Sequence, residues 1–438
     1  MSTTLDVISE SEQAVLDLHK EFLKDSDPAL KPLNEAGIRR FEAVKFPHRK
    51  HEMYTFVNTH DLTETRFQLT GHAAADAKEV QAAVYPSCQD RVIVFVNGVY
   101  DEKLSNTSGL EAEVKITPLV QAIQDEAVQE YLLATVEEEN DVFAALNSGF
   151  AKDGLVVSVA EKAVIEKPLQ VLYVSTGTDN GTVASHPRLL VKLQPRAEFK
   201  LAVKFIGQGA GYFVNAVQDF LVDPDAGLTY WQVQRDDPAV WHMSKTRVHL
   251  HRNSRFVCTN GSSGSRLARH HYEVRLKDEG AELNMNGISV LENEEQAHNF
   301  VRVHHEAPHC TSNQFFRNVI NNKARSSFDG TVIVDKGAQL TNSDQLINNL
   351  MLSDDGKADA KPNLMIFADD VKCTHGATVG QIDEDQLFYL KTRGLSEAVG
   401  KSILTKSFVT SIIDAVPFED VVRDFNQYLL KKLEADNV

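Results

Sequence analysis

Apolar positions recur at helical spacing in the first part of the chain. Residues 14–22 carry them behind Ser11, which we expect to cap a helix, and residues 33–44 repeat the pattern. A basic cluster at 49–51 has no clear assignment and is typical of a solvated loop. We therefore predict an N-terminal helical region over residues 1–90.

A strand and a further helical segment follow. Residues 91–100 are apolar and β-branched and end in the Asn97-Gly98 pair, which is typical of a strand entering a tight turn. Residues 117–148 return to helical spacing and predict a helical insertion. Within that insertion, residues 137–141 are expected to form an exposed acidic run.

Short alternating runs dominate residues 154–378 and predict a long β region. A small or polar residue followed by such a run recurs at intervals of 29, 28, 27, 26, 31 and 31 residues. The anchors of this repeat are Ala197, Ala226, Ser254, Ala281, Ala307, Ala338 and Asp369. This period favours a β-helix, in which each rung buries its inward side chains against the next, over a sandwich or a propeller.

The C-terminal part is again helical. Asp383 is expected to open a helix over residues 384–393 that Gly394 ends, Ser396 to cap a second helix, and Pro417 to start a last one.

The predicted architecture is therefore mainly β and has three units. A parallel β-helix core over residues 91–380, with an insertion at about 117–148, lies between the helical region 1–90 and a helical domain at 381–438.

Composition and charge exclude several classes of partner. The 438 residues are 42% hydrophobic and 24% charged, which is typical of a soluble globular protein. A net charge of -17 argues against binding to nucleic acid or to an anionic membrane. Four cysteines are too few for a disulfide framework, and neither a leader segment nor a membrane-spanning segment is evident. We expect a cytoplasmic protein with reduced thiols.

Most catalytic motifs are missing from the sequence. The stretch 394–402 resembles a phosphate-binding loop, but five residues separate its glycines where the motif has four, and it follows a helix. His304, His305, His309 and Cys310 are the densest group of possible metal ligands, yet their spacing matches no closed zinc pattern. We expect ordinary surface or core roles for them.

Cys373 and His375 are the more promising pair. At positions i and i+2 of a strand they share one face, and a thiolate with an imidazole suits iron or copper. Cys373 is more simply interpreted as a small buried residue beside Val371. A bend at Gly376 would let His375 turn outward at the last rung, where a partner subunit could complete a metal site.

Five stretches resemble one family, the SufB/SufD scaffolds of iron-sulfur cluster assembly. The Cys-Thr-His-Gly sequence at 373–376 is similar to the SufD branch, whereas the SufB branch has acidic residues beside this histidine. The five stretches are VFVNGVYDEKLS (94–105), FAALNSGFAKDG (143–154), ARSSFDGTVIV (324–334), KPNLMIFADDVKCTHGATVG (361–380) and DEDQLFYLKTRG (383–394).

The resemblance implies a right-handed parallel β-helix in a cytoplasmic complex with one SufB and two copies of the ATPase SufC. It implies that His375 helps to build a transient iron-sulfur cluster at the interface with SufB, with Cys373 as the weaker candidate. The C-terminal helices, around Phe408 and Ile412, would dock SufC. The chain would be a non-catalytic scaffold, with ATP hydrolysis in SufC. A flavin on the assembled complex stays open and is not assigned to this chain.

Two alternatives remain open at the level of the sequence. A cytosolic β-helix enzyme acting on carbohydrate would use carboxylates on neighbouring rungs as acid and base. A homodimeric scaffold would pair two chains through an exposed sheet edge. The sequence does not assign roles to Cys88, Cys258 and Cys310.

Overall fold

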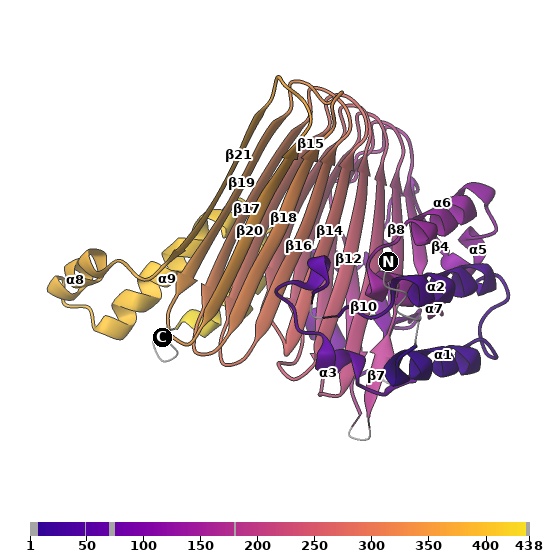
Figure 1. Ribbon diagram of the computed structural model, residues 1–438, viewed down its shortest axis with the longest axis horizontal. Coiled ribbons are helices and arrows are strands. Elements are labelled where there is room, and N and C mark those ends of the chain that lie inside the picture. Colours follow the sequence, from indigo (N-terminus) through magenta and orange to yellow (C-terminus); the bar gives the residue numbers. More distant parts are fainter. Residues whose placement is uncertain (1–7, 49, 70–74, 179–180, 435–438) are drawn as a thin grey trace, which may run out of the picture.

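Two long β-sheets face each other and form a β-helix, with helices at both ends of the chain (Figure 1). Their strands pair in parallel except β3 with β2 and β4 with β5, which are antiparallel. The computed structural model describes residues 8–48, 50–69, 75–178 and 181–434, so Arg49 of the basic cluster lies outside the described residues. The predicted class, a mainly β chain with a parallel β-helix flanked by helical regions, is confirmed.

Sheet A has eleven strands and sheet B has ten. The path of sheet A is β20-β18-β16-β14-β12-β10-β8-β5-β4, with β7 and β1 beside it, and the order of sheet B is β21-β19-β17-β15-β13-β11-β9-β6-β2-β3. The strands of sheet A are β1 (Phe67–Leu69), β4 (Val114–Pro118), β5 (Leu155–Val159), β7 (Thr182–Ser185), β8 (Arg188–Leu193), β10 (Tyr212–Val222), β12 (Trp241–Leu250), β14 (Leu267–Leu276), β16 (Gln296–His305), β18 (Arg325–Val334) and β20 (Lys357–Ile366). Those of sheet B are β2 (Val92–Val96), β3 (Val99–Tyr100), β6 (Leu169–Thr176), β9 (Glu198–Gln208), β11 (Gly227–Arg235), β13 (Arg255–Ser262), β15 (Glu282–Leu291), β17 (Thr311–Ile320), β19 (Asn342–Met351) and β21 (Lys372–Gly380).

The predicted repeat corresponds to the seven sheet B strands from β9 to β21. Register partners on successive strands are 29, 28, 27, 29, 31 and 30 residues apart. The first four anchors stand immediately before their strands as fully buried corner residues; they are Ala197, Ala226, Ser254 and Ala281. The anchors at Ala307, Ala338 and Asp369 were placed too early. Buried Cys310 and Thr341 hold the corners before β17 and β19, because a corner requires a small side chain rather than alanine in particular.

The N-terminal helices cover one end of the coil. Ser9, and not Ser11, caps the first helix, because Ser9 and Glu12 form a reciprocal capping box. Ser11 lies inside the first turn and donates to the carboxylate of Glu64 at 2.7 Å. The helical elements of this region are α1 (Glu10–Phe22), α2 (Lys31–Val44), the 3-10 turn η1 (Glu52–Tyr54), α3 (His60–Thr63), α4 (Ala77–Ala83) and the 3-10 turn η2 (Pro86–Cys88), and strand β1 lies between α3 and α4.

The predicted insertion consists of α5 (Leu119–Ala122), α6 (Glu126–Glu137) and α7 (Val142–Gly149). The expectation of an exposed acidic run at 137–141 was wrong for two of its members, since Glu139 and Asp141 are 3% and 2% exposed. Glu139 pairs with Lys245 at 2.6 Å and with Arg247. Asp141 pairs with Arg269 at 2.6 Å. Cations on the outer face of sheet A therefore bury these carboxylates.

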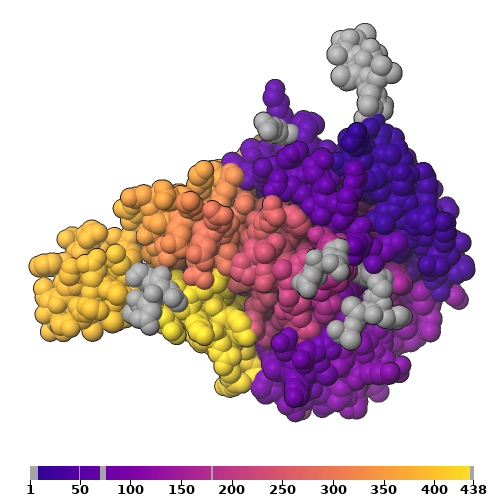
Figure 2. Space-filling model, turned by 90° about the horizontal axis from the view of Figure 1, so that it is seen from below, coloured from indigo at the N-terminus to yellow at the C-terminus, as the bar shows by residue number. Residues whose placement is uncertain are grey.

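The C-terminal helices begin where predicted, except the last. Asp383 caps α8 (Glu384–Thr392), and Ser396 caps α9 (Glu397–Ile413). The last helix, α10 (Glu419–Asp424), begins two residues after Pro417 and continues into a π-helical turn, η3 (Phe425–Leu429), and a 3-10 turn, η4 (Leu430–Leu433). Figures 1 and 2 show α8 projecting from one end of the molecule.

The end of the chain folds back onto sheet B. Asp424 accepts hydrogen bonds from the hydroxyl of Tyr85 at 2.8 Å and from Arg235 at 2.7 Å. It also pairs with Lys204 at 2.8 Å, and burial lowers the pKa of this lysine to about 8. This buried group of charges joins the tail to the coil.

Candidate functional site

The β-helix ends in two uncovered strands, β20 of sheet A and β21 of sheet B. Within the described ranges no further strand pairs with either, so one edge of each presents unpaired backbone groups. Apolar side chains at this end are 38% to 59% exposed; they are Met365, Ile366, Phe367 and Val379. An apolar surface beside an open edge is typical of a protein interface. We call this region, β20 and β21 with residues 365–380, the end face.

Cys373 and His375 lie in the middle of the end face and share one side of β21, as predicted. Their register partners on β19 are the buried residues Ser343 and Gln345. Both side chains therefore point toward the axis of the coil. The expected bend at Gly376 is wrong, because β21 keeps regular pairing with β19 from Lys372 to Gly380. His375 is exposed because no further rung covers it.

The two candidate ligands differ in their surroundings. Cys373 is half-buried and packs with Val371 against the main core. Burial raises the pKa of the Cys373 thiol, and a hydrogen bond from the backbone of Ser343 offsets part of this. The thiolate, which is the form that binds metal, is therefore disfavoured. His375 forms no side-chain hydrogen bond or ion pair within the described chain. Its imidazole is available to an external ligand.

Two polar columns run through the interior beneath the end face, beside apolar core side chains such as Ile347 and Phe316. The column under His375 continues through Gln345 and Gln314, and the Gln345 amide donates to Gln314 at 3.1 Å. Under Cys373, the hydroxyls of Ser343 and Ser312 lie 2.9 Å apart. Sequence reasoning missed these residues, although polar residues at inward positions of the last rungs were a signal that could have revealed them.

The histidine-rich stretch before β17 does not form a metal site. His305 points inward and lies 2.8 Å from Ser312, whereas His304 points outward and pairs with Asp335 at 2.9 Å. His309 is exposed on a turn and Cys310 is a buried corner. No group of three or more metal-binding side chains occurs in the part of the chain that the structure describes. The side chains of this stretch point in different directions because alternate strand positions face opposite sides.

Phe408 and Ile412 do not form an exposed surface in this chain. Ile412 is 2% exposed and belongs to a core cluster between the tail and sheet B. Phe408 is half-buried, and Arg317 stacks 5.0 Å from its ring and donates to its backbone carbonyl. Both side chains are used to fold the tail onto the coil. The exposed apolar residues of α8 and α9 are instead Phe388, Tyr389 and Ile403.

The cysteines show no disulfide bond among the described residues. All four cysteines are free, and Cys88, Cys258 and Cys310 are buried in the core. Burial raises the pKa of Cys88 to about 12, so it is an inert thiol. No helix in the described residues has the length and apolar character needed to cross a membrane.

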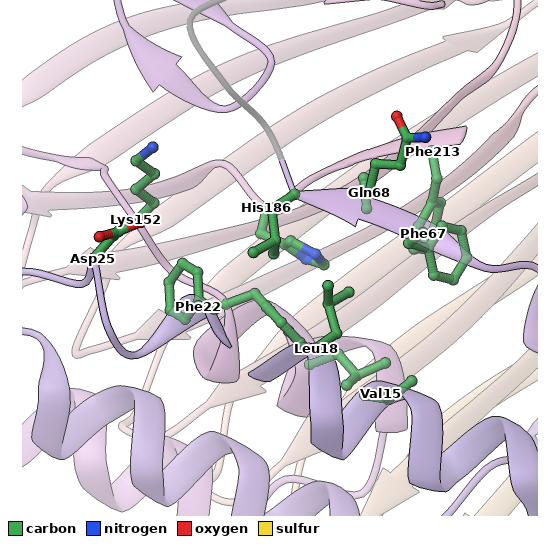
Figure 3. A pocket seen from close by; sticks show the side chains of 13 residues that line it. Val15, Leu18, Phe22, Asp25, Phe67, Gln68, Lys152, His186 and Phe213 are labelled. Carbon is green, nitrogen blue, oxygen red and sulfur yellow. The ribbon is translucent and has the colours of Figure 1, made fainter. Parts of the chain in front are cut away.

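A small apolar cavity of about 110 Å³ lies between α1, β1 and α7, far from the end face. Figure 3 shows Leu18 and Phe22 from α1 lying near Phe67 and His186. Burial lowers the pKa of His186 to about 3, so the ring is neutral. The cavity is smaller than the pockets of about 300–1,000 Å³ that hold cofactors, and we do not assign it a functional role.

The sequence is similar to one family of known proteins along most of its length. The family model for the SufBD core domain of the SUF system of iron-sulfur cluster assembly matches residues 173–408, and that for the SufBD N-terminal region matches residues 10–171. SufD of Escherichia coli is 27% identical over 389 residues, which cover 88% of this chain and 89% of that protein. An iron-sulfur cluster assembly SufBD family protein of Synechocystis is 28% identical over 388 residues, or 86% of this chain and 85% of that protein. The chain belongs to the SufBD family and has a role in iron-sulfur cluster assembly within the Suf system.

Proposed function

We propose that this chain is a non-catalytic scaffold subunit that pairs with SufB through the end face and contributes His375 to a nascent iron-sulfur cluster. The observation that carries the proposal is the position of His375, an exposed imidazole without a partner of its own on the uncovered last rung. Imidazole can replace cysteine as a ligand to cluster iron. Family membership favours this role over an enzyme that acts on carbohydrate.

Pairing through the end face follows from the chemistry of strand edges. β20 and β21 present backbone donors and acceptors beside exposed Met365, Phe367 and Val379. A second β-helix of the same kind could satisfy both by continuing the sheets. SufB is the partner proposed here, and a second copy of this chain would use the same edges in isolation.

Charge on the end face should disrupt this pairing. Val379→Lys introduces a charge at a side chain that is 57% exposed, and lysine on an edge strand opposes pairing. We expect the variant to lose SufB in co-purification. Val257→Lys, at an exposed valine within sheet B, is the matched control. Normal recovery of SufB by Val379→Lys would contradict the proposed interface.

The ligand role of His375 can be tested by anaerobic cluster assembly on the co-expressed complex. His375→Ala should lower the iron and sulfide bound per complex, while His60→Ala, at an exposed histidine on α3, should leave both unchanged. Cys373→Ala should assemble normal amounts, because Cys373 packs against the core. An intact complex with His375→Ala that holds wild-type amounts of cluster would contradict the ligand role.

We propose that the projecting helices dock SufC and that SufC hydrolyses ATP. Phe388 and Tyr389 on α8 are 67% and 55% exposed, which is unusual for aromatic side chains of a monomer. They replace Phe408 and Ile412 as the expected contact. The proposed complex has one SufB and two SufC for each copy of this chain.

The docking proposal predicts the effect of one charge on α8. Phe388→Asp should lose SufC without losing SufB, because α8 projects away from the β-helix (Figure 2). Val164→Asp, at a valine that is 59% exposed on a loop after β5, is the control. Unchanged SufC recovery with Phe388→Asp would contradict docking on α8.

A further inference from the structure

A groove of about 630 Å³ lies on the outer face of sheet A, away from the end face. Its floor is formed by β12, β14 and β16, and the C-terminal half of α6 forms one wall. Met53 of η1 lines another side, and Figure 1 shows this segment crossing in front of the sheet. The volume falls within the range of small-molecule sites.

The strand register arranges basic side chains in a grid on the floor. Arg247, Glu273 and Arg302 are register partners on β12, β14 and β16. His249, Arg275 and His304 form the neighbouring column, and Lys245, His271 and Phe300 form a third. Neighbouring strands lie about 4.8 Å apart, so a ligand that lies across them could contact side chains from more than one strand.

Three of the cations in the groove are neutralised by the protein, and they bind the insertion and a neighbouring turn to the sheet. Their pairs are Lys245 with Glu139 at 2.6 Å and Glu273 at 2.9 Å, Arg247 with Glu139 and Asp219, and Arg275 with Glu306. These side chains hold the groove in shape and are not available to a ligand.

Arg302 and Lys277 are different. Arg302 lies 4.6 Å over the ring of Phe300 and donates to the hydroxyl of Thr331. Neither Arg302 nor Lys277 has a carboxylate within 4.0 Å among the described residues. Arg302 and Lys277 are therefore the two cations of the groove that form no ion pair within the described residues, while the carboxylates of Glu138 and Glu273 also line it.

Neutral imidazoles complete the polar lining. Burial, together with the nearby Lys277, lowers the pKa of His249 to about 4. Burial and Lys245 lower the pKa of His271 to about 4 as well. At neutral pH these rings can donate or accept a hydrogen bond without adding charge.

We propose that this groove binds a small molecule that carries a phosphate group, with Arg302 and Lys277 as its charged contacts. The planar guanidinium of Arg302 matches two phosphate oxygens, and its stacking on Phe300 fixes the plane of this fork. The groove is bounded by α6 and η1, so it favours a small ligand over a polymer.

Calorimetric titration of the full chain with inorganic pyrophosphate at constant ionic strength tests the proposal. We expect saturable binding, and we expect Arg302→Gln and Lys277→Gln each to weaken it at least about tenfold. Lys323→Gln removes an equal charge from an exposed turn outside the groove and should bind normally. Arg302→Lys keeps the charge without the fork and should give an intermediate affinity.

Three results would overturn the assignment. They are the absence of saturable binding up to about 10 mM pyrophosphate, an equal loss of affinity in Lys323→Gln, and equal affinity for citrate, which would show that the groove selects charge rather than phosphate. Far-ultraviolet circular dichroism of each variant establishes that the coil is intact, so a loss of affinity reports on the groove itself.

Discussion

Replacing Asp141 by asparagine should reveal how strongly the insertion is bound to sheet A. The carboxylate lies 2.6 Å from Arg269 and 2.7 Å from His271, and it accepts a hydrogen bond from Tyr54 at 2.8 Å. The side chains of Asp141 and Arg269 are both 2% exposed. Asparagine keeps the size of the side chain, but its NH2 group can only donate, whereas both oxygens of Asp141 accept hydrogen bonds. Asp141→Asn therefore removes the charge and leaves donors on one side of the residue without an acceptor.

The expected loss in the free energy of unfolding depends on the groups that surround Arg269 in the variant. Arg269 has no other carboxylate within 4.0 Å in the described chain, so its buried charge loses its compensation. Breaking a buried pair costs about 3–5 kcal/mol, and the loss of acceptor capacity in addition to the charge places this variant in the upper part of that range. Urea unfolding followed by circular dichroism gives the difference from the shift in midpoint. Asp125→Asn, an exposed cap on α6, should stay within about 0.5 kcal/mol of wild type.

The pH dependence of the stability difference between wild type and Asp141→Asn provides a second test. Burial alone would raise the pKa of Asp141, but Arg269 and His271 outweigh it and hold the pKa well below its usual range. In the unfolded chain the pKa of this carboxyl is about 3.9. The ion pair therefore stabilises the folded state above that pH, and this stabilisation is lost as the pH falls toward the pKa of the folded state. The difference between wild type and Asp141→Asn should therefore be largest at neutral pH. A loss below about 1 kcal/mol at pH 7, or a difference that persists in acid, would refute the reasoning.

Further predictions concern other parts of the fold. Gly37→Ala should destabilise the chain by about 1–3 kcal/mol in urea, because its Cβ would lie 2.2 Å from a backbone nitrogen of α7; Gly337→Ala, in open space, is the control. Cys373 should react first with iodoacetamide in the native chain, as read by mass spectrometry, because the other three thiols are buried; equal rates would contradict this. Asp424→Asn should speed hydrogen exchange across α10, since two cations of sheet B lose their partner; exposed Asp414→Asn should not.

The β-helix could be predicted from the sequence because its determinants are local. Alternation defines each strand, and a small corner residue such as Ala226 or Ala281 recurs once per turn of the coil. Helix caps are local as well, and Asp383 and Ser396 were both assigned correctly. Ser9 was missed because Ser11 lies two residues away with the same chemistry.

The errors concern contacts between distant segments. Glu139 and Asp141 look like a solvated run, and only the cations of β12 and β14, more than 100 residues later, bury them. Ile412 lies on the apolar side of α9, but a helical pattern does not reveal which surface covers that side. The exposure of His375 was predicted correctly, but its cause was not. The predicted cause was a bend at Gly376, whereas β21 is regular and His375 is exposed because no further rung follows in the described chain.

The two polar columns beneath the end face suit a coil that must be stable both uncovered and paired. Apolar residues at these positions would expose more hydrocarbon whenever the last rung frays, and would favour nonspecific association. Gln345 and Gln314 hydrogen-bond to each other when buried, as do Ser343 and Ser312, and water can replace these bonds when the rung opens. His375 continues the first of these columns by one position, so a partner that stacks on β21 would extend a polar column. A ligand at His375 would then be enclosed by side chains that can accept or donate hydrogen bonds.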